Sequence, residues 1–165
     1  MQDFKYYAPT EVVFGKDAEE HLVEMINKYG GKKVLVHYGG HSAERSGLLA
    51  SVREKLNAAG IAFVELGGVK PNPRLTLVHE GIELCRKENV DFILAVGGGS
   101  VIDSSKAIGY GVKYDGDVWD IYARKYVPTE MLPVGVILTI PAAGSEMSDS
   151  SVITKEDGDL KIGYS

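Results

Sequence analysis

Three glycines and a serine at residues 97–100 form the segment of this chain best suited to chemistry. They follow residues 92–96, an apolar run typical of a buried parallel strand. Ser100 is suited to cap a helix over about residues 101–110. Glycine lets a ligand approach the backbone, and the free N–H groups and the dipole of a helix start attract an anion. The segment therefore predicts a phosphate or pyrophosphate site in a nucleotide-binding domain. A plain tight turn is the alternative, because the run lacks the spacing of the GxGxxG fingerprint.

Asp103 lies about one turn into the predicted helix, beside this anion site. A carboxylate there repels phosphate unless it points elsewhere, toward a ribose hydroxyl or the reacting end of a ligand. The alternative is a solvated carboxylate in the first helical turn, where it interacts favourably with the helix dipole. The residue pattern leaves both interpretations open.

Strands alternate with helices along the chain, and the connections are short. Strands are predicted at residues 11–14, 33–38, 61–66, 92–96 and 132–140, helices at 17–29, 46–59, 75–89 and 101–110, and a hairpin over 151–154 and 160–163. In the first helix, Leu22, Met25, Ile26 and Tyr29 share one face, which we expect to be buried. Alternation of this kind is typical of a parallel sheet. The predicted fold class is α/β: a Rossmann-like parallel sheet with helices on both faces, plus a C-terminal β-hairpin.

Small and polar residues follow three of the predicted strands, at residues 39–42, 97–100 and 139–145. A parallel sheet brings the carboxyl ends of its strands to one edge, where ligands of open α/β sheets bind. We therefore expect the three loops to converge on one crevice. A dinucleotide is long enough to contact all of them.

The composition limits the classes of function. The 165 residues suit one domain, and 44% hydrophobic with 25% charged residues is ordinary for a soluble globular protein. The formal charge of −5, without a basic cluster, argues against nucleic-acid and anionic-membrane partners. No apolar run is long enough for a membrane span, and the polar start resembles no signal peptide. The single cysteine, Cys85, is expected in the core of a helix, so a cytoplasmic location is predicted.

The four histidines do not form a metal-binding pattern. His37 and His41 are four residues apart, but a strand end and two glycines separate them, so they cannot share a helix face. We interpret both as turn or surface residues, and place His21 and His79 near the margins of helices. No metal site is predicted in this chain.

Four motifs together resemble the iron-containing (group III) alcohol dehydrogenases. They are VVFG at residues 12–15, PNP at 71–73, GGGSVID at 97–103 and LTIPAAGSE at 138–146, and they span most of the chain. The likeness is greatest to the butanol-dehydrogenase branch of NAD(P)H-dependent alcohol and aldehyde reductases. It implies that residues 1–165 are the N-terminal dinucleotide-binding domain of a dehydroquinate-synthase-like fold.

The resemblance also implies an activity, hydride transfer between a nicotinamide and a primary alcohol or aldehyde. In this family a C-terminal helical domain supplies one aspartate and three histidines to a catalytic divalent metal, iron or zinc. That domain is expected to be absent here, so a metal belongs only to the full-length enzyme. We therefore predict that this chain binds cofactor but is inactive alone, with no catalytic residue of its own.

The resemblance implies cofactor contacts for the positions that match the family's glycine motif. By resemblance, Gly98, Gly99 and Ser100 hold the pyrophosphate and Asp103 lies near the nicotinamide ribose.

Four further positions are implied to contact the two ends of the cofactor. Thr139 and Ser145 line the adenine and nicotinamide stretches respectively. Asn72 contacts the adenosine side, and Lys161 reaches the nicotinamide-side ribose or phosphate.

The turn after the second predicted strand matches the place of the adenosine ribose. Gly39, Gly40 and Ser42 are its implied contacts. An acidic residue there would pair with the ribose hydroxyls of NAD and repel the extra phosphate of NADP. Since the turn has none, NADP is the predicted cofactor and NAD the alternative.

Other interpretations stay open. Glycerol dehydrogenase, maleylacetate reductase and dehydroquinate synthase share the cofactor-domain pattern. A non-catalytic nucleotide-binding or assembly module from a shortened gene is a second alternative. The resemblance also suggests a homodimer formed through the N-terminal strand.

Overall fold

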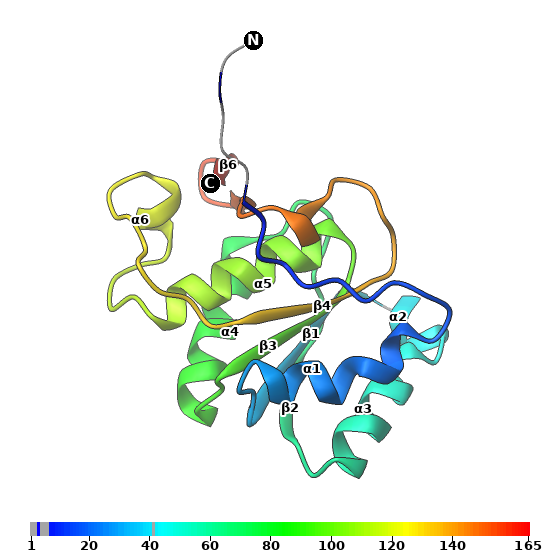
Figure 1. Cartoon of the computed structure of the whole chain (residues 1–165). Coiled ribbons are helices and arrows are strands. Elements are labelled where there is room, and N and C mark those ends of the chain that lie inside the picture. The colour runs from blue at the N-terminus through cyan, green and yellow to red at the C-terminus, as the bar shows by residue number, and fades with distance from the viewer. Residues whose placement is uncertain (1–2, 4–6, 41) are drawn as a thin grey trace.

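The computed structural model describes residue 3, residues 7–40 and residues 42–165, with only the backbone of Ser42. Its centre is a parallel sheet in the order β2-β1-β3-β4 (Figure 1). The four strands are β1 (Lys33–Tyr38), β2 (Ala62–Leu66), β3 (Phe92–Gly97) and β4 (Val134–Leu138). This sheet confirms the predicted fold class, because every strand pair in it is parallel.

Helices cover both faces of the sheet (Figure 1). The longer ones are α1 (Leu22–Lys28), α3 (Leu48–Ala58), α4 (Leu75–Glu88) and α5 (Gly99–Val112). Side chains alternate along a strand, so Val34 and Val36 pack with α1 and α3, whereas Leu35 packs with α4 and α5. None of the described helices is long and apolar enough to cross a membrane.

An antiparallel hairpin packs on α5 after the sheet is complete. It consists of β5 (Ser151–Lys155) and β6 (Leu160–Tyr164), as the sequence predicted. The Ser151 hydroxyl donates to the backbone oxygen of Asp103 over 2.8 Å, and Ile153 is fully buried. The hairpin is therefore held to the helix that follows the glycine run.

The strand predicted at residues 11–14 is wrong, because in the structure this segment forms no strand. The Phe14 side chain is 98% exposed. Glu11 instead accepts hydrogen bonds from the Lys28 ammonium and the Tyr29 hydroxyl, both over 2.8 Å. That contact also turns Tyr29 outward, against the prediction that it shares the buried face of the first helix.

Short helical segments were harder to foresee than the long ones. The sequence prediction missed α2 (Ser42–Arg45) and α6 (Trp119–Tyr122). It also did not distinguish two 3₁₀ turns, η1 (Ala18–His21) and η2 (Ser145–Met147), from the helix and the loop predicted there. The predicted start of α5 was also wrong. The helix begins at Gly99 with Gly98 as its N-cap, and no side chain caps it, so Ser100 lies inside the first turn.

Cys85 is confirmed as a core residue of α4, with 1% of its surface exposed. Burial raises the pKa of its thiol to about 12. Since the thiolate is the reactive form, we expect no reaction of the native chain with a disulfide reagent at pH 8 and full reaction in denaturant. A thiol count shows this directly; stoichiometric labelling of the folded chain would contradict it.

Candidate functional site

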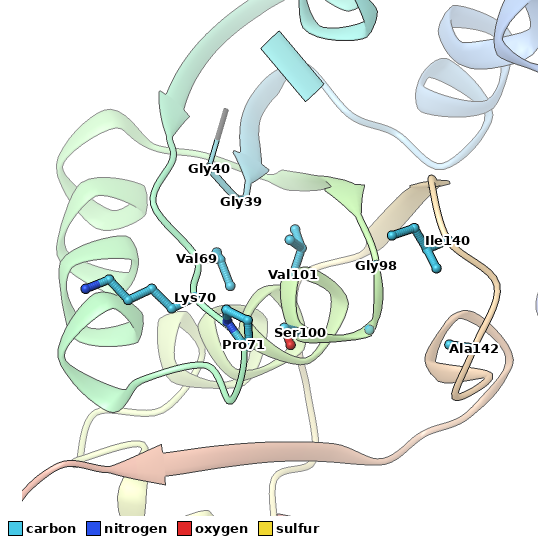
Figure 2. A pocket seen from close by; sticks show the side chains of 11 residues that line it. Gly39, Gly40, Val69, Lys70, Pro71, Gly98, Ser100, Val101, Ile140 and Ala142 are labelled. Atoms are coloured by element: carbon cyan, nitrogen blue, oxygen red, sulfur yellow. The ribbon is translucent and has the colours of Figure 1, made fainter. Parts of the chain in front are cut away.

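A cavity of about 310 Å³ opens where the strands of the sheet end (Figure 2). Segments that follow all four strands contribute to its wall. The lining residues are Gly39 and Gly40 after β1, Val69, Lys70 and Pro71 after β2, Gly98, Gly99, Ser100 and Val101 after β3, and Ile140 and Ala142 after β4. The predicted convergence of three loops is therefore confirmed, and a fourth segment joins them.

The glycine run turns the chain sharply from β3 into α5. The backbone oxygen of Gly98 accepts from the amides of Val101 and Ile102, and so closes the first helical turn. The amides of Gly99 and Ser100 lie in that turn, where helix geometry offers them no partner within the helix. They border the cavity together with the positive end of the helix dipole, which is the arrangement that attracts an anion.

A side chain at Gly99 would narrow this end of the cavity. A Cβ atom built there lies 3.3 Å from the Ser145 hydroxyl oxygen and 3.9 Å from the Ala143 methyl carbon. The absence of a side chain therefore leaves space between the start of α5 and the loop after β4. Ser145 is 9% exposed and lies beside this space, but it does not line the cavity itself.

A buried lysine holds the loop that carries Ser145. The Lys106 ammonium donates to the backbone oxygens of Ser145, Ser148 and Ser150 over 2.7–2.8 Å. Burial lowers the pKa of Lys106, and the nearby carboxylate of Asp103 opposes that effect. The sequence analysis missed this residue, although Lys106 is the single basic residue of a helix that is otherwise mostly buried.

Asp103 points from α5 toward the hairpin. Its Oδ2 accepts from the Val152 amide over 3.1 Å, while its buried Oδ1 has no partner among the described residues. Burial raises the pKa of this carboxyl group, and the hydrogen bond from Val152, the Ser145 hydroxyl and the nearby ammonium groups of Lys106 and Lys161 oppose the rise. The solvated-carboxylate alternative is therefore wrong, since the side chain is packed and one of its two carboxylate oxygens is hydrogen-bonded to the hairpin.

Asn72 and Lys161 lie together outside the cavity wall. The Lys161 ammonium donates to Asn72 Oδ1 over 2.7 Å, joining the corner after β2 to β6. The Thr154 amide on β5 donates to the oxygen of Pro73 over 2.8 Å and ties the same corner to the hairpin. These two implied cofactor contacts thus contact each other in this structure.

Two other implied contacts remain at the margin of the site. Thr139 is exposed and its amide donates to the Gly97 oxygen over 3.1 Å, so it continues the pairing of β4 with β3. Ser42 begins α2, but its side chain, like the whole of His41, lies outside the described residues.

His37 is fully buried, so its placement as a turn or surface residue is wrong. The ring lies on β1, with Nδ1 2.7 Å from the Leu66 oxygen and Nε2 2.8 Å from the Ser104 hydroxyl. Position 37 shares the face of Leu35, which packs against α5, and this parity explains the burial.

Burial of His37 makes stability depend on pH. Burial lowers the pKa of the folded imidazole to about 4, against 6.5 ordinarily, although the hydrogen bond to Leu66 opposes this. Between these values the unfolded chain binds a proton that the folded chain does not, so stability falls as the pH falls from 6.5 toward 4, by roughly 3 kcal/mol. Urea unfolding at several pH values should show a free energy of unfolding that falls between pH 6.5 and 4, and the His37→Phe variant should have a smaller slope of this free energy against pH. An equal slope in both proteins would contradict the assignment.

The described residues contain no group of three or more His, Cys, Asp or Glu side chains that could hold a metal ion. His79, for example, contacts a single carboxylate, with Nε2 3.0 Å from Asp117 Oδ1. A catalytic metal therefore does not fit the residues described here.

Comparison with known proteins adds an independent line of evidence. Residues 9–165 match the family model of the iron-containing alcohol dehydrogenases. The chain is 51% identical over 164 residues to a probable NADH-dependent butanol dehydrogenase 1 of Bacillus subtilis, covering 99% of this chain and 42% of that protein. It is 36% identical over 170 residues to the NADPH-dependent aldehyde reductase YqhD of Escherichia coli, covering 100% of this chain and 43% of that protein.

A solved structure agrees with the sequence relatives. The crystal structure of NADH-dependent butanol dehydrogenase A from Thermotoga maritima superposes with a TM-score of 0.97 at 44% identity. The match covers 100% of this chain and 42% of that one. The chain thus spans less than half the length of these relatives.

Proposed function

Since the chain belongs to the iron-containing alcohol dehydrogenase family, we propose that residues 1–165 form the dinucleotide-binding part of an alcohol dehydrogenase or aldehyde reductase. The observation that carries the proposal is the cavity at the strand ends, with the start of α5 in its wall. The proposed reaction is hydride transfer between a nicotinamide and a primary alcohol or aldehyde.

The residues present fit a dinucleotide. Gly99 and Ser100 offer backbone amides to a pyrophosphate, and the missing Cβ of Gly99 leaves room for it beside Ser145. The buried Oδ1 of Asp103, without a protein partner among the described residues, can accept a hydrogen bond from a ribose hydroxyl.

The two ends of the cofactor are assigned to different residues around the glycine run. We propose that the adenosine end lies toward Gly39 and Gly40, with Ser42, Asn72 and Thr139 nearby. The nicotinamide end would lie toward the hairpin, close to the Asn72–Lys161 contact. There, Ser145, Asp103 and Lys161 orient the ring. The bound nicotinamide supplies or accepts the hydride, and the role of this chain is to bind and orient it.

No metal step is assigned to this chain, because its described residues do not form a ligand set. We propose that the chain binds cofactor without turning over substrate. An assay of NADH oxidation with butanal tests this on the purified chain. Sustained turnover by a preparation free of any full-length enzyme would contradict the proposal. A cytoplasmic location and a homodimer remain predictions.

NADP remains the predicted cofactor and NAD the alternative. The Gly39-Gly40 turn carries no carboxylate to repel a ribose phosphate. The Bacillus subtilis relative is named NADH-dependent and the Escherichia coli relative NADPH-dependent, so the family uses both.

Parallel fluorescence titrations with NADH and NADPH test the proposal. We expect saturable binding of one equivalent to the folded chain, with NADPH binding more tightly. Tighter binding of NADH would reverse the cofactor preference and keep the function. Failure of both to bind a chain shown to be folded by circular dichroism would overturn the proposed function.

A further inference from the structure

The buried ring of His37 connects three segments of the fold. It projects from β1, its Nδ1 lies 2.7 Å from the backbone oxygen of Leu66 at the end of β2, and its Nε2 lies 2.8 Å from the hydroxyl of Ser104 on α5. His37 and Ser104 are both 0% exposed. Solvent therefore cannot replace the hydrogen bond between His37 and Ser104 without opening the core, whereas the bond to Leu66 is part-buried.

The partners fix the protonation of the ring. A backbone oxygen can only accept, so Nδ1 must carry the proton and donate to Leu66. The neutral ring then has Nε2 free to accept, and the Ser104 hydroxyl donates to it. This is the less common tautomer of histidine in water, and here the Leu66 oxygen and the Ser104 hydroxyl enforce it.

His37 and its two partners each lie within four residues of a residue that lines the cavity. Gly39 follows His37 by two residues, Val69 follows Leu66 by three, and Ser100 precedes Ser104 by one helical turn. Backbone hydrogen bonds already join the ends of β1 and β2, since Gly68 and Val69 donate to Gly39 and Tyr38. Across the described part of the chain, the His37–Ser104 bond is the hydrogen bond that joins β1 to α5.

We propose that His37 is a positioning residue for cofactor binding: its two hydrogen bonds hold the segments after β1 and β2 at a fixed distance from the start of α5. This inference rests on the proposed function, because the fixed distance matters for a ligand that contacts both sides. An apolar side chain of equal volume would fill the core as well, but it would leave the Leu66 oxygen and the Ser104 hydroxyl without partners.

A set of substitutions separates positioning from core filling. His37→Phe keeps the ring volume and removes both hydrogen bonds. The amide of His37→Asn can occupy the Nδ1 position and donate to Leu66, but it is too short to reach Ser104. Ser104→Ala removes the same bond from the other partner. The control is Cys85→Ala, which removes buried volume from α4 at a residue that does not line the cavity.

Affinity for NADH is measured on each variant at a temperature where circular dichroism shows it folded. We expect His37→Phe to weaken binding about tenfold. His37→Asn and Ser104→Ala should each weaken it by a smaller factor, and the two factors should be similar to each other. Because these two remove the same bond, their double variant should be no weaker than either single one. Cys85→Ala should bind within about twofold of the original chain.

The tautomer provides a readout that core filling does not affect. In ¹⁵N NMR spectra of the imidazole rings we expect His37 to carry its proton on Nδ1, and to keep it there in the Ser104→Ala variant, because the Leu66 oxygen still accepts from Nδ1. If His37→Phe does not fold, His37→Asn and Ser104→Ala still decide the question.

Three results would overturn the inference. The first is unchanged NADH affinity, either in a folded His37→Phe chain or in both His37→Asn and Ser104→Ala. Another is a His37 ring protonated on Nε2. The third is an original chain that binds neither NADH nor NADPH, which overturns the proposed function and this inference with it, whereas the first two leave the proposed function intact.

Discussion

Replacing Gly99 with aspartate should weaken NADH binding at least about 100-fold while leaving the chain folded. Gly99 is the first residue of α5, and a side chain there enters the space between the helix start and Ser145. A carboxylate in that space would lie within a few ångströms of a bound pyrophosphate. At an effective dielectric constant near 20, two unit charges about 4 Å apart repel by about 4 kcal/mol.

The fold should tolerate this change, because an acidic side chain in the first turn interacts favourably with the helix dipole. Gly99→Asn is the matched control, since asparagine has almost the same shape without the charge. We expect it to weaken binding far less than Gly99→Asp. Titration calorimetry measures both variants, and equal losses would show that space rather than charge decides the effect. Unchanged affinity in Gly99→Asp would place the cofactor elsewhere.

Lys106→Met should lower the free energy of unfolding by about 3 kcal/mol. Methionine matches the apolar stem of lysine and lacks the ammonium group that binds three backbone oxygens. These oxygens then lose a buried charged donor, and the loop over residues 145–150 must open to water to satisfy them. Hydrogen exchange of that loop should accelerate while the hairpin stays protected.

Arg86→Met is the control for Lys106→Met. Arg86 donates to the backbone oxygens of Gly111 and Tyr114 at the other end of α5, where one of those bonds is exposed. We expect it to cost less stability and to leave the loop over residues 145–150 unchanged. Urea unfolding compares the two variants. A loss below about 1 kcal/mol for Lys106→Met would contradict the role assigned to its ammonium group.

The sheet was predictable from the sequence because its strands are continuous apolar runs. The predicted range of β1 matches the observed Lys33–Tyr38, and β3 extends the predicted run by one residue to Gly97. The run at residues 11–14 has a similar composition but no neighbouring strand to pair with, so Phe14 is exposed. Pairing depends on contacts between distant segments, which a local pattern does not contain.

The site was predictable in part for the same reason. Glycines after a strand indicate a close approach of ligand to backbone, and the structure places Gly39, Gly40, Gly98 and Gly99 around one cavity. The roles of polar residues depend on their distant partners. The spacing of residues gave no sign that Asn72 binds Lys161 or that His37 is buried between Leu66 and Ser104.

The most direct test of a cofactor site at the strand ends is a map of NADH contacts along the chain. In ¹⁵N-labelled protein, addition of NADH should shift the amide resonances of Gly39, Gly40, Gly98, Gly99 and Ser100 most strongly. The amides at the tip of the hairpin, residues 156–159, should stay unchanged. Shifts concentrated at the hairpin tip, or saturable binding without any shift in the glycine run, would contradict the account.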